Sequence, residues 1–420
     1  MWVVLVLTGE RAKLASYKGQ PADVYAYQLQ MLSPNGKSVS GRSTGQLNVQ
    51  PDWSMGYRLK DEQNSNYWAI NPQGFRAPEP LPREKPPGEV RIFLLGSSAT
   101  FGQGLKADEQ TIARRLEQRL QARLAQQKQS PEKYKPTTLP NTAAGLQAIQ
   151  SLPRQLKSGT YHVINAAVPG YASGNQLAQV ALEILPYQPD VIVVMNGYDD
   201  LMLASDQEMA ILEPITQRIE KPLQSAWQSV TRPFLEFIRN TRTFKAIQFY
   251  LLKPQPSLPQ QALPLASANA DWLDYLPEDG ADLDERVQRY RQNMKQLIQL
   301  CAGARVPLIV SLQPEITGID VDNYTSTEAA IASTLPENYQ TLIPEGYAQL
   351  ELSNNELEKA FPNNVKILNY YPLFNDLSAA AFTDPVNLTD DGTKALSERF
   401  YNAIAELPQL QVIPSQPQPQ

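Results

Sequence analysis

The stretch that decides the fold is Glu89-Val-Arg-Ile-Phe-Leu-Leu-Gly-Ser-Ser-Ala-Thr-Phe-Gly102, an apolar run that ends in a tight turn of small residues. The run Val90–Leu95 is continuous rather than alternating, which is typical of a strand covered on both faces. A helical pattern follows over Asp108–Gln127. A buried strand, a Gly/Ser turn and a helix together indicate a parallel α/β unit.

The same alternation continues along the chain. Further apolar runs predict strands over His162–Ala167, Asp190–Met195, Val306–Leu312 and Val365–Asn369. Helical spacing predicts helices over Gly174–Leu185, Asp284–Gly303 and Thr389–Ala405. We therefore expect a three-layer α/β/α fold with a mostly parallel five-stranded sheet, flavodoxin-like, with an N-terminal extension and helical insertions.

The expected domain organisation has three parts. Residues 1–88 form an extension that is partly β, and the α/β domain covers 89–407 with insertions at about 204–283 and 315–345. The second insertion is polar and is expected to be irregular. The Pro/Gln-rich end, 408–420, has a composition typical of disorder.

Three segments keep two interpretations. The apolar Met1–Leu7 fits a buried strand or short helix, or the tail of a membrane anchor that begins upstream. The aromatic segment Phe234–Leu252 fits core packing better than a membrane face. Residues 8–89 fit a β-rich extension that wraps the main domain, with an independent carbohydrate-binding module as the weaker interpretation.

Composition excludes several classes of protein. The net charge of −6 makes nucleic acid an unexpected partner, because backbone binding needs a basic face. One cysteine, Cys301, excludes an internal disulfide, and with one histidine, His162, a common zinc site is not expected. We expect neither a metal nor another cofactor; the composition does not indicate an oligomeric state.

Polar blocks follow the predicted strands. The first is Gly96–Gly104, which lacks the Gly-Lys-Ser/Thr of a phosphate-binding loop. The others are Asn165–Ser173, Asn196–Leu201 and Asp384–Asn387. Because parallel sheets bind ligands at the carboxyl ends of their strands, we expect these blocks to meet.

These four blocks, in this order, resemble those of the SGNH/GDSL hydrolase superfamily over roughly residues 56–405. The segments Gly56–Leu59 and Asn71–Arg76 also resemble the lead-in of bacterial members that handle cell-surface polysaccharides. The resemblance implies that Ser98 is the nucleophile and that Asp384 orients a base at position 387. It implies an oxyanion hole from the N–H groups of Ser98 and Gly170 and the side chain of residue 199.

The chain departs from the family pattern at three positions. Ser97 replaces the usual aspartate, which is a mild change between small polar side chains. Asp199 replaces the asparagine of the oxyanion hole, and Asn387 replaces the histidine. An ionised Asp199 cannot donate a hydrogen bond, and Asn387 cannot accept a proton near pH 7.

Two residues, His162 and Asp199, are considered as substitutes for the missing histidine base. His162 begins its strand, so it lies at the end away from the polar blocks and is expected to be structural. Asp199 could act as the base if burial beside Asp200 or Asp384 raises its pKa. The alternative is a structural role, in which Asp199 only caps a turn. Gln313 and Glu315, just after the fourth strand, are expected at the rim of the same site.

Two functions follow. The first is an esterase-like protein that hydrolyses or transfers O-acyl groups on carbohydrate or lipid through Ser98, with impaired or atypical acid/base residues. The second is an inactive member that binds a ligand or a partner in a cell-envelope polysaccharide system. The resemblance favours an extracytoplasmic or membrane-associated location, with any membrane attachment through a missing upstream segment.

Overall fold

The centre of the fold is a sheet of five parallel strands. The structure, a computed structural model, describes residues 22–33, 36, 45–210 and 275–416. The strands are β6 (Glu89–Leu95), β7 (Thr160–Asn165), β8 (Val191–Asn196), β9 (Leu308–Leu312) and β10 (Val365–Asn369). Their order is β10-β9-β8-β6-β7, which is the flavodoxin-like order. The predicted fold class is confirmed.

The strand order places a switch point between β6 and β8. β6 pairs with β7 on one side, where Leu94 lies opposite Asn165. It pairs with β8 on the other, where Leu95 lies opposite Val194. The loops after β6 and β8 therefore leave the sheet side by side, but their crossovers run in opposite directions. Ligands of such sheets bind at this point.

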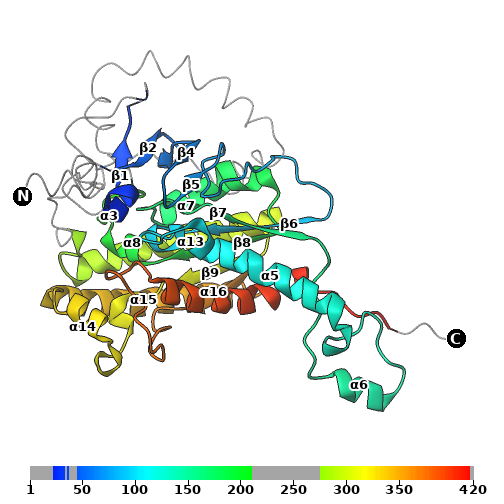
Figure 1. The fold of residues 1–420 in the computed structure, drawn as a ribbon. Coiled ribbons are helices and arrows are strands. Elements are labelled where there is room, and N and C mark those ends of the chain that lie inside the picture. The colour runs from blue at the N-terminus through cyan, green and yellow to red at the C-terminus, as the bar shows by residue number, and fades with distance from the viewer. Residues whose placement is uncertain (1–21, 34–35, 37–44, 211–274, 417–420) are drawn as a thin grey trace, which may run out of the picture.

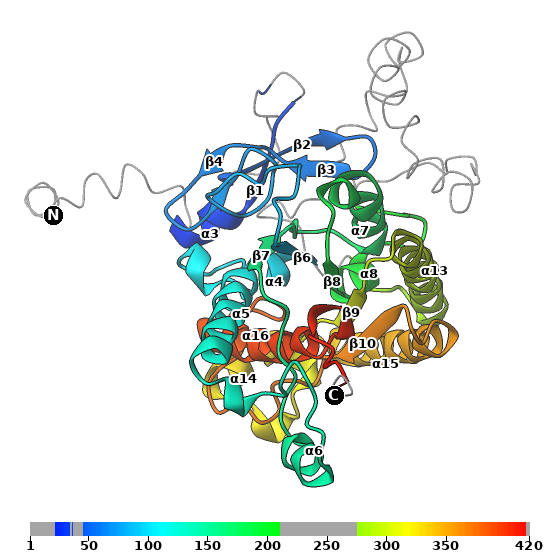
Figure 2. The same ribbon diagram turned by 90° about the vertical axis from the view of Figure 1, so that its right-hand side faces the viewer.

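Helices cover both faces of the sheet (Figures 1 and 2). α5 (Ile112–Gln129) and α16 (Asp390–Ala405) pack together on one face, while α7 (Ser173–Gln179), α13 (Gly280–Ala304) and α15 (Glu337–Ala360) pack on the other. β8 is buried along its whole length, as its continuous apolar sequence predicts. α16 begins after Thr389, whose side chain caps the helix by accepting from Gly392 N, so the helix predicted over Thr389–Ala405 is confirmed.

Several helical boundaries differ from those predicted. After α7 the chain continues as a π-helical turn, Val180–Ile184, and a 3₁₀ turn, Leu185–Tyr187. The stretch 315–345 is not irregular. It contains 3₁₀ turns at Ile316–Gly318 and Val321–Asn323, the helix α14 (Ser326–Ala332) and the start of α15.

Local capping explains why this insertion is helical. Thr325 and Glu328 form a capping box at the start of α14. In α15 the buried residues recur at helical spacing despite an internal Pro344: Tyr339, Ile343, Tyr347 and Leu350.

The extension forms a small layer against the domain. It contains α3 (Ala22–Tyr27), a sheet of β1 (Leu29–Met31), β2 (Leu47–Asp52) and β3 (Gly56–Leu59), and a hairpin of β4 (Gln63–Asn64) and β5 (Ala69–Ile70). Its side chains share one core with residues of the main domain, including Phe101 and Tyr171. The extension is thus partly β and packed on the domain.

An arm projects between α5 and β7. It carries a 3₁₀ turn, Pro131–Lys133, and α6 (Ala143–Ile149), beside the C-terminal segment (Figure 1). Residues 408–416 differ from the predicted disorder: Pro408–Leu410 forms a 3₁₀ turn, and Val412 and Ser415 donate backbone hydrogen bonds to the carbonyls of Gln155 and Thr137. Backbone pairing of this kind does not need apolar side chains, so composition does not reveal it.

Some predictions lie outside the described residues. These are Met1–Leu7, residues 211–274 of the insertion predicted at about 204–283, which include Phe234–Leu252, and the last four residues. Within the described residues, no helix combines the length and the apolar character that a membrane crossing requires.

Candidate functional site

The Gly/Ser turn after β6 opens a short helix, α4 (Ser98–Phe101), with Ser97 at its N-cap. The helix ends at Gly102, whose φ of +91° favours glycine. Ser98 is half-buried, and its hydroxyl makes no hydrogen bond within the described part of the chain. The predicted nucleophile is therefore partly exposed and unengaged.

Ser97 is the more tightly held of the two serines. It is 1% exposed, and its Oγ accepts a hydrogen bond from Gly170 N over 2.8 Å. The Gly170 N–H was expected to serve an oxyanion hole, but in this structure Ser97 already occupies it. The Ser97 hydroxyl also lies near the Asp199 carboxyl and lowers its pKa. Ser97, Gly170 and Asp199 thus form one connected group.

Gly170 is fixed by its backbone and by a tyrosine. Its φ is +85°, and a Cβ at this position would lie 2.5 Å from Tyr57 Oη. The same Tyr57 hydroxyl donates to the carbonyl of Pro169 over 2.7 Å. Only glycine fits here without strain.

Asp199 follows β8 on α8 (Tyr198–Met202), after Gly197 at φ +121°. Burial raises the pKa of Asp199 to about 7; the nearby Ser97 hydroxyl opposes this shift and nearby Asp200 adds to it. Near neutral pH this carboxyl exchanges between a proton acceptor and a proton donor. In its protonated form it can donate a hydrogen bond, as the asparagine of the family pattern does.

Asp384 and Asn387 form a second group on the loop before α16. The Asp384 carboxylate accepts from Val386 N, from Asn387 N and from Asn387 Nδ2 over 3.0, 2.8 and 2.8 Å. Asn387 is 4% exposed, and its Oδ1 has no partner within the described residues. The expected pairing of positions 384 and 387 is therefore present, with an amide in place of an imidazole.

Asp200 has a structural role rather than a place in a catalytic pair. It is 1% exposed and accepts from Ser173 N over 3.0 Å and from the Ser173 hydroxyl. Burial raises its pKa. Since its oxygens are committed to the start of α7, Asp200 holds α8 against α7.

Glu315 was expected only as a rim residue, but it is fully buried. Tyr339 Oη donates to it over 2.7 Å, and Thr317 donates through its N–H over 2.9 Å and through its hydroxyl. Burial raises the pKa of Glu315 to about 7. Ile316 N donates to the carbonyl of Pro385, which joins this loop to the Asp384 loop. The contact with Tyr339 was missed because α15 itself was not predicted.

Gln313 shares this rim. It is 1% exposed, its N–H donates to the carbonyl of Asn196 over 2.9 Å, and its Oε1 has no partner in the described ranges. It therefore links the ends of β8 and β9 beside the site.

His162 does not belong to the site. It lies in β7 opposite Arg91, at the end of the sheet away from the polar blocks, and its Nδ1 is 3.6 Å from Glu117 Oε2. The Glu117 contact raises the pKa of His162. Within the described residues, no group of His, Cys, Asp and Glu side chains has the arrangement of a metal site.

The structure thus brings Ser97, Gly170 and Asp199 together, and separately Asp384 and Asn387. No hydrogen bond among the described residues joins Ser98 to either group. The chemistry available is the weakly acidic carboxyl of Asp199 near Ser97 of the turn, and, in the second group, the Asn387 amide with an acceptor that is unpaired within the described residues.

No family model matches the sequence, and the search of curated proteins found no match. Similar solved structures include a lipase/acylhydrolase from Enterococcus faecalis, with a TM-score of 0.37 and 14% identity over 75% of this chain and 95% of that chain. An acetyl xylan esterase from Geobacillus stearothermophilus has a TM-score of 0.36 and 13% identity over 78% and 97%. An esterase from Pseudoalteromonas has a TM-score of 0.34 and 11% identity over 75% and 96%. These values are too low to bear on function, which depends on the residues of this chain.

Proposed function

We propose that this chain is an SGNH/GDSL-type esterase-like protein that hydrolyses or transfers O-acyl groups through Ser98, with Asp199 as an atypical base. The observation that carries the proposal is the Asp199 carboxyl, half-buried on α8 with a pKa of about 7, near Ser97 of the Ser97-Ser98 turn. A carboxyl poised near the working pH is suited to general acid/base work.

In the proposed step, the Ser98 hydroxyl oxygen bonds to the acyl carbon of the substrate. Ionised Asp199 takes the proton of that hydroxyl at the same time. Protonated Asp199 then returns the proton to the leaving alcohol, and water or a second alcohol removes the acyl group from Ser98. The Ser98 N–H stabilises the oxyanion. The Gly170 N–H is held by Ser97 and contributes only if Ser97 rotates, so we expect slow turnover.

The proposed substrate is an O-acylated carbohydrate or lipid. This choice depends on the resemblance of Gly56–Leu59 and Asn71–Arg76 to the lead-in of bacterial members that handle cell-surface polysaccharides. An extracytoplasmic or membrane-associated location goes with that choice.

A second function is ligand binding without turnover. It is favoured by the amide at position 387: Asn387 Nδ2 is committed to Asp384, and Oδ1 cannot take up a proton. Losing a triad member leaves roughly 10³–10⁴-fold rate enhancement over water.

Covalent labelling separates the two functions. The full chain is treated with a fluorophosphonate and assayed with an aryl acetate, alongside Ser98→Ala and the matched control Ser97→Ala. Labelling that is lost in Ser98→Ala and kept in Ser97→Ala supports the enzyme. If the wild type shows no reaction that depends on Ser98, the enzyme proposal fails and binding remains.

The paired substitutions give the second test. Asn387→His combined with Asp199→Asn restores the residue types of the family pattern. If this double change lowers an existing activity, Asp199 is the base. If it creates activity where the wild type has none, the natural protein is an inactive form, and Asp199 is not a base.

A further inference from the structure

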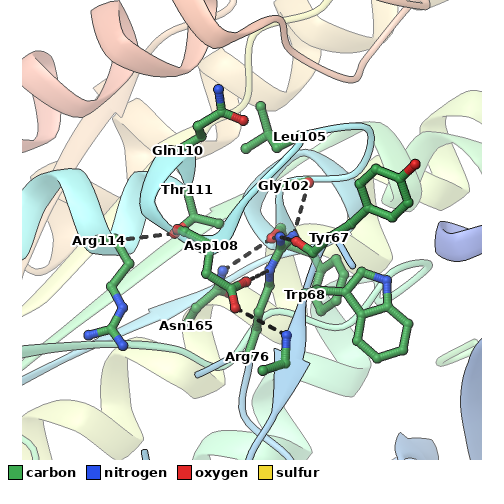
Figure 3. A network of polar contacts seen from close by, with 12 residues as sticks. Tyr67, Trp68, Arg76, Gly102, Leu105, Asp108, Gln110, Thr111, Arg114 and Asn165 are labelled. Atoms are coloured by element: carbon green, nitrogen blue, oxygen red, sulfur yellow. Dashed lines mark hydrogen bonds and ion pairs between the residues drawn. The ribbon is translucent and has the colours of Figure 1, made fainter. Parts of the chain in front are cut away.

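Arg76 of the extension is buried at the back of the Ser98 turn. It is 3% exposed, and its Nε donates to Asp108 Oδ1 over 2.7 Å. A buried arginine needs partners for all its N–H groups, because each unpaired one is costly. The other partners come from the extension and from the turn itself (Figure 3).

Two of the partners are carbonyls at the end of α4. Arg76 Nη1 donates to Phe101 O over 2.8 Å and to Gly102 O over 3.0 Å. These are the last helical residue and the C-cap of the helix that begins at Ser98. The guanidinium therefore binds the carbonyls that the end of a helix leaves without intrahelical partners.

A second polar side chain reinforces this contact from β7. Asn165 Nδ2 donates to the carbonyls of Thr100 and Phe101 over 3.3 and 3.2 Å, while Arg76 N donates to Asn165 O over 3.0 Å. The backbone of Arg76 is thus tied to β7, and its side chain to α4.

The other partners come from the extension. Arg76 Nη2 donates to the Tyr67 carbonyl over 3.0 Å and to Tyr27 Oη over 3.1 Å, and Tyr27 Oη donates to Leu105 O over 2.7 Å. The guanidinium carbon lies 5.4 Å from the centre of the Tyr27 ring and 4.8 Å from that of Phe101. Asp108 Oδ2 in turn accepts from Ala69 N over 3.1 Å.

We propose that Arg76 is a positioning residue, and that with Asp108 it fixes the backbone of the Ser98 turn from behind. The N-terminal extension then contributes to the site, because it supplies the residue that positions the Ser98 turn. The inference concerns the conformation of the turn, so it holds for an enzyme and for a non-hydrolytic binder alike.

Arg76→Lys is the test. An ammonium keeps the charge but cannot reproduce the planar set of five donors. The matched control is Arg91→Lys. Arg91 is equally buried, pairs with Glu89 and donates to the carbonyl of Tyr187, but it lies at the start of β6.

The first readout is amide hydrogen exchange of Gly102 and Gln103, which both donate to Ser98 O over 3.0 Å. We expect Arg76→Lys to speed their exchange about tenfold relative to β8 amides, and Arg91→Lys to leave that ratio within about twofold. The second readout is the rate of thiol alkylation in Ser98→Cys, made in a Cys301→Ala background. We expect Arg76→Lys to change this rate and Arg91→Lys to leave it within about twofold.

An unchanged exchange ratio in Arg76→Lys, or an equal change in Arg91→Lys, overturns the proposal. If Arg76→Lys does not fold, Asp108→Asn replaces it, because it weakens the ion pair and keeps the guanidinium. A smaller selective increase is then expected, and no increase overturns the proposal. Neither readout needs Ser98 to react with an ester, so failure here is separable from failure of the proposed activity.

Discussion

The side chain of Asn387 donates its Nδ2–H to Asp384 Oδ2 over 2.8 Å, and its Oδ1 is left without a partner in the described ranges. A neutral histidine at this position can make the same donor contact and leave the same kind of acceptor free. The asparagine therefore offers the same hydrogen-bonding pattern as a neutral histidine but cannot take up a proton near pH 7.

Asp384→Ala should destabilise the fold, because the carboxylate accepts three hydrogen bonds from its own loop. We expect a loss of about 1–3 kcal/mol in the free energy of unfolding, measured with urea. The control is Asp376→Ala, an exposed aspartate on the neighbouring loop, which should cost less than about 0.5 kcal/mol. Equal losses from the two variants would show that the Asp384 bonds are not stabilising.

Asp199→Asn should become relatively more stable than the wild type as the pH rises. The folded pKa of Asp199 is about 7, so the folded state keeps a proton that the unfolded chain has already released above about pH 4. Wild-type stability is therefore lost as the pH rises from about 4 to 7, and an asparagine does not titrate.

We expect the difference between the two proteins to grow by about 2 kcal/mol between about pH 4 and pH 8, with allowance for the solvent around a half-buried side chain. Urea unfolding at these two pH values measures it. Because Glu315 and Asp200 are present in both proteins, their titration largely cancels. A difference that does not vary with pH would mean that the pKa of Asp199 is not raised.

Gly170→Ala should destabilise the loop after β7 by about 1–3 kcal/mol, from a positive φ and a contact with Tyr57 Oη. Tyr57→Phe removes the contacting hydroxyl and also its bond to Pro169 O. The double variant should therefore lose less stability than the sum of the two single losses, measured by thermal unfolding. Strict additivity would show that the hydroxyl does not crowd position 170.

His162→Gln should lower stability only at acidic pH. The Glu117 contact raises the pKa of His162, so the stabilising contribution is full below the unfolded pKa of about 6.5 and is lost as the pH rises through the folded pKa. The side chain is 45% exposed, so we expect less than about 1 kcal/mol at about pH 5 and no difference at about pH 9. Glu117→Gln should reproduce this pH trend, and any loss of Ser98 labelling in His162→Gln would contradict a structural role.

The sheet was predictable because each of its strands is a continuous apolar run between helical patterns, and those runs need no partner to be identified. α15 was not, since Pro344 and its polar surface obscure a helix whose apolar face appears only when Tyr339, Ile343 and Tyr347 are placed against the sheet. Tertiary packing, rather than the local sequence pattern, therefore determines that α15 is helical.

In the site, too, local features were predictable from the sequence and tertiary contacts were not. Asp384 and Asn387 are three residues apart on one loop, so their pairing follows from local sequence. The contact of Ser97 with Gly170 joins residues 73 positions apart and depends on which of two neighbouring hydroxyls turns inward. Sequence spacing identifies the serine pair but not that choice.

The position of Arg76 has a practical consequence for dissecting the chain. The Pro-rich stretch 78–87 looks like a natural place to divide the protein, and a shortened gene starting at residue 89 would encode every strand of the large sheet. Such a fragment would lack the guanidinium that holds the carbonyls of Phe101 and Gly102. Inactivity of that fragment would therefore carry no information about the intact protein.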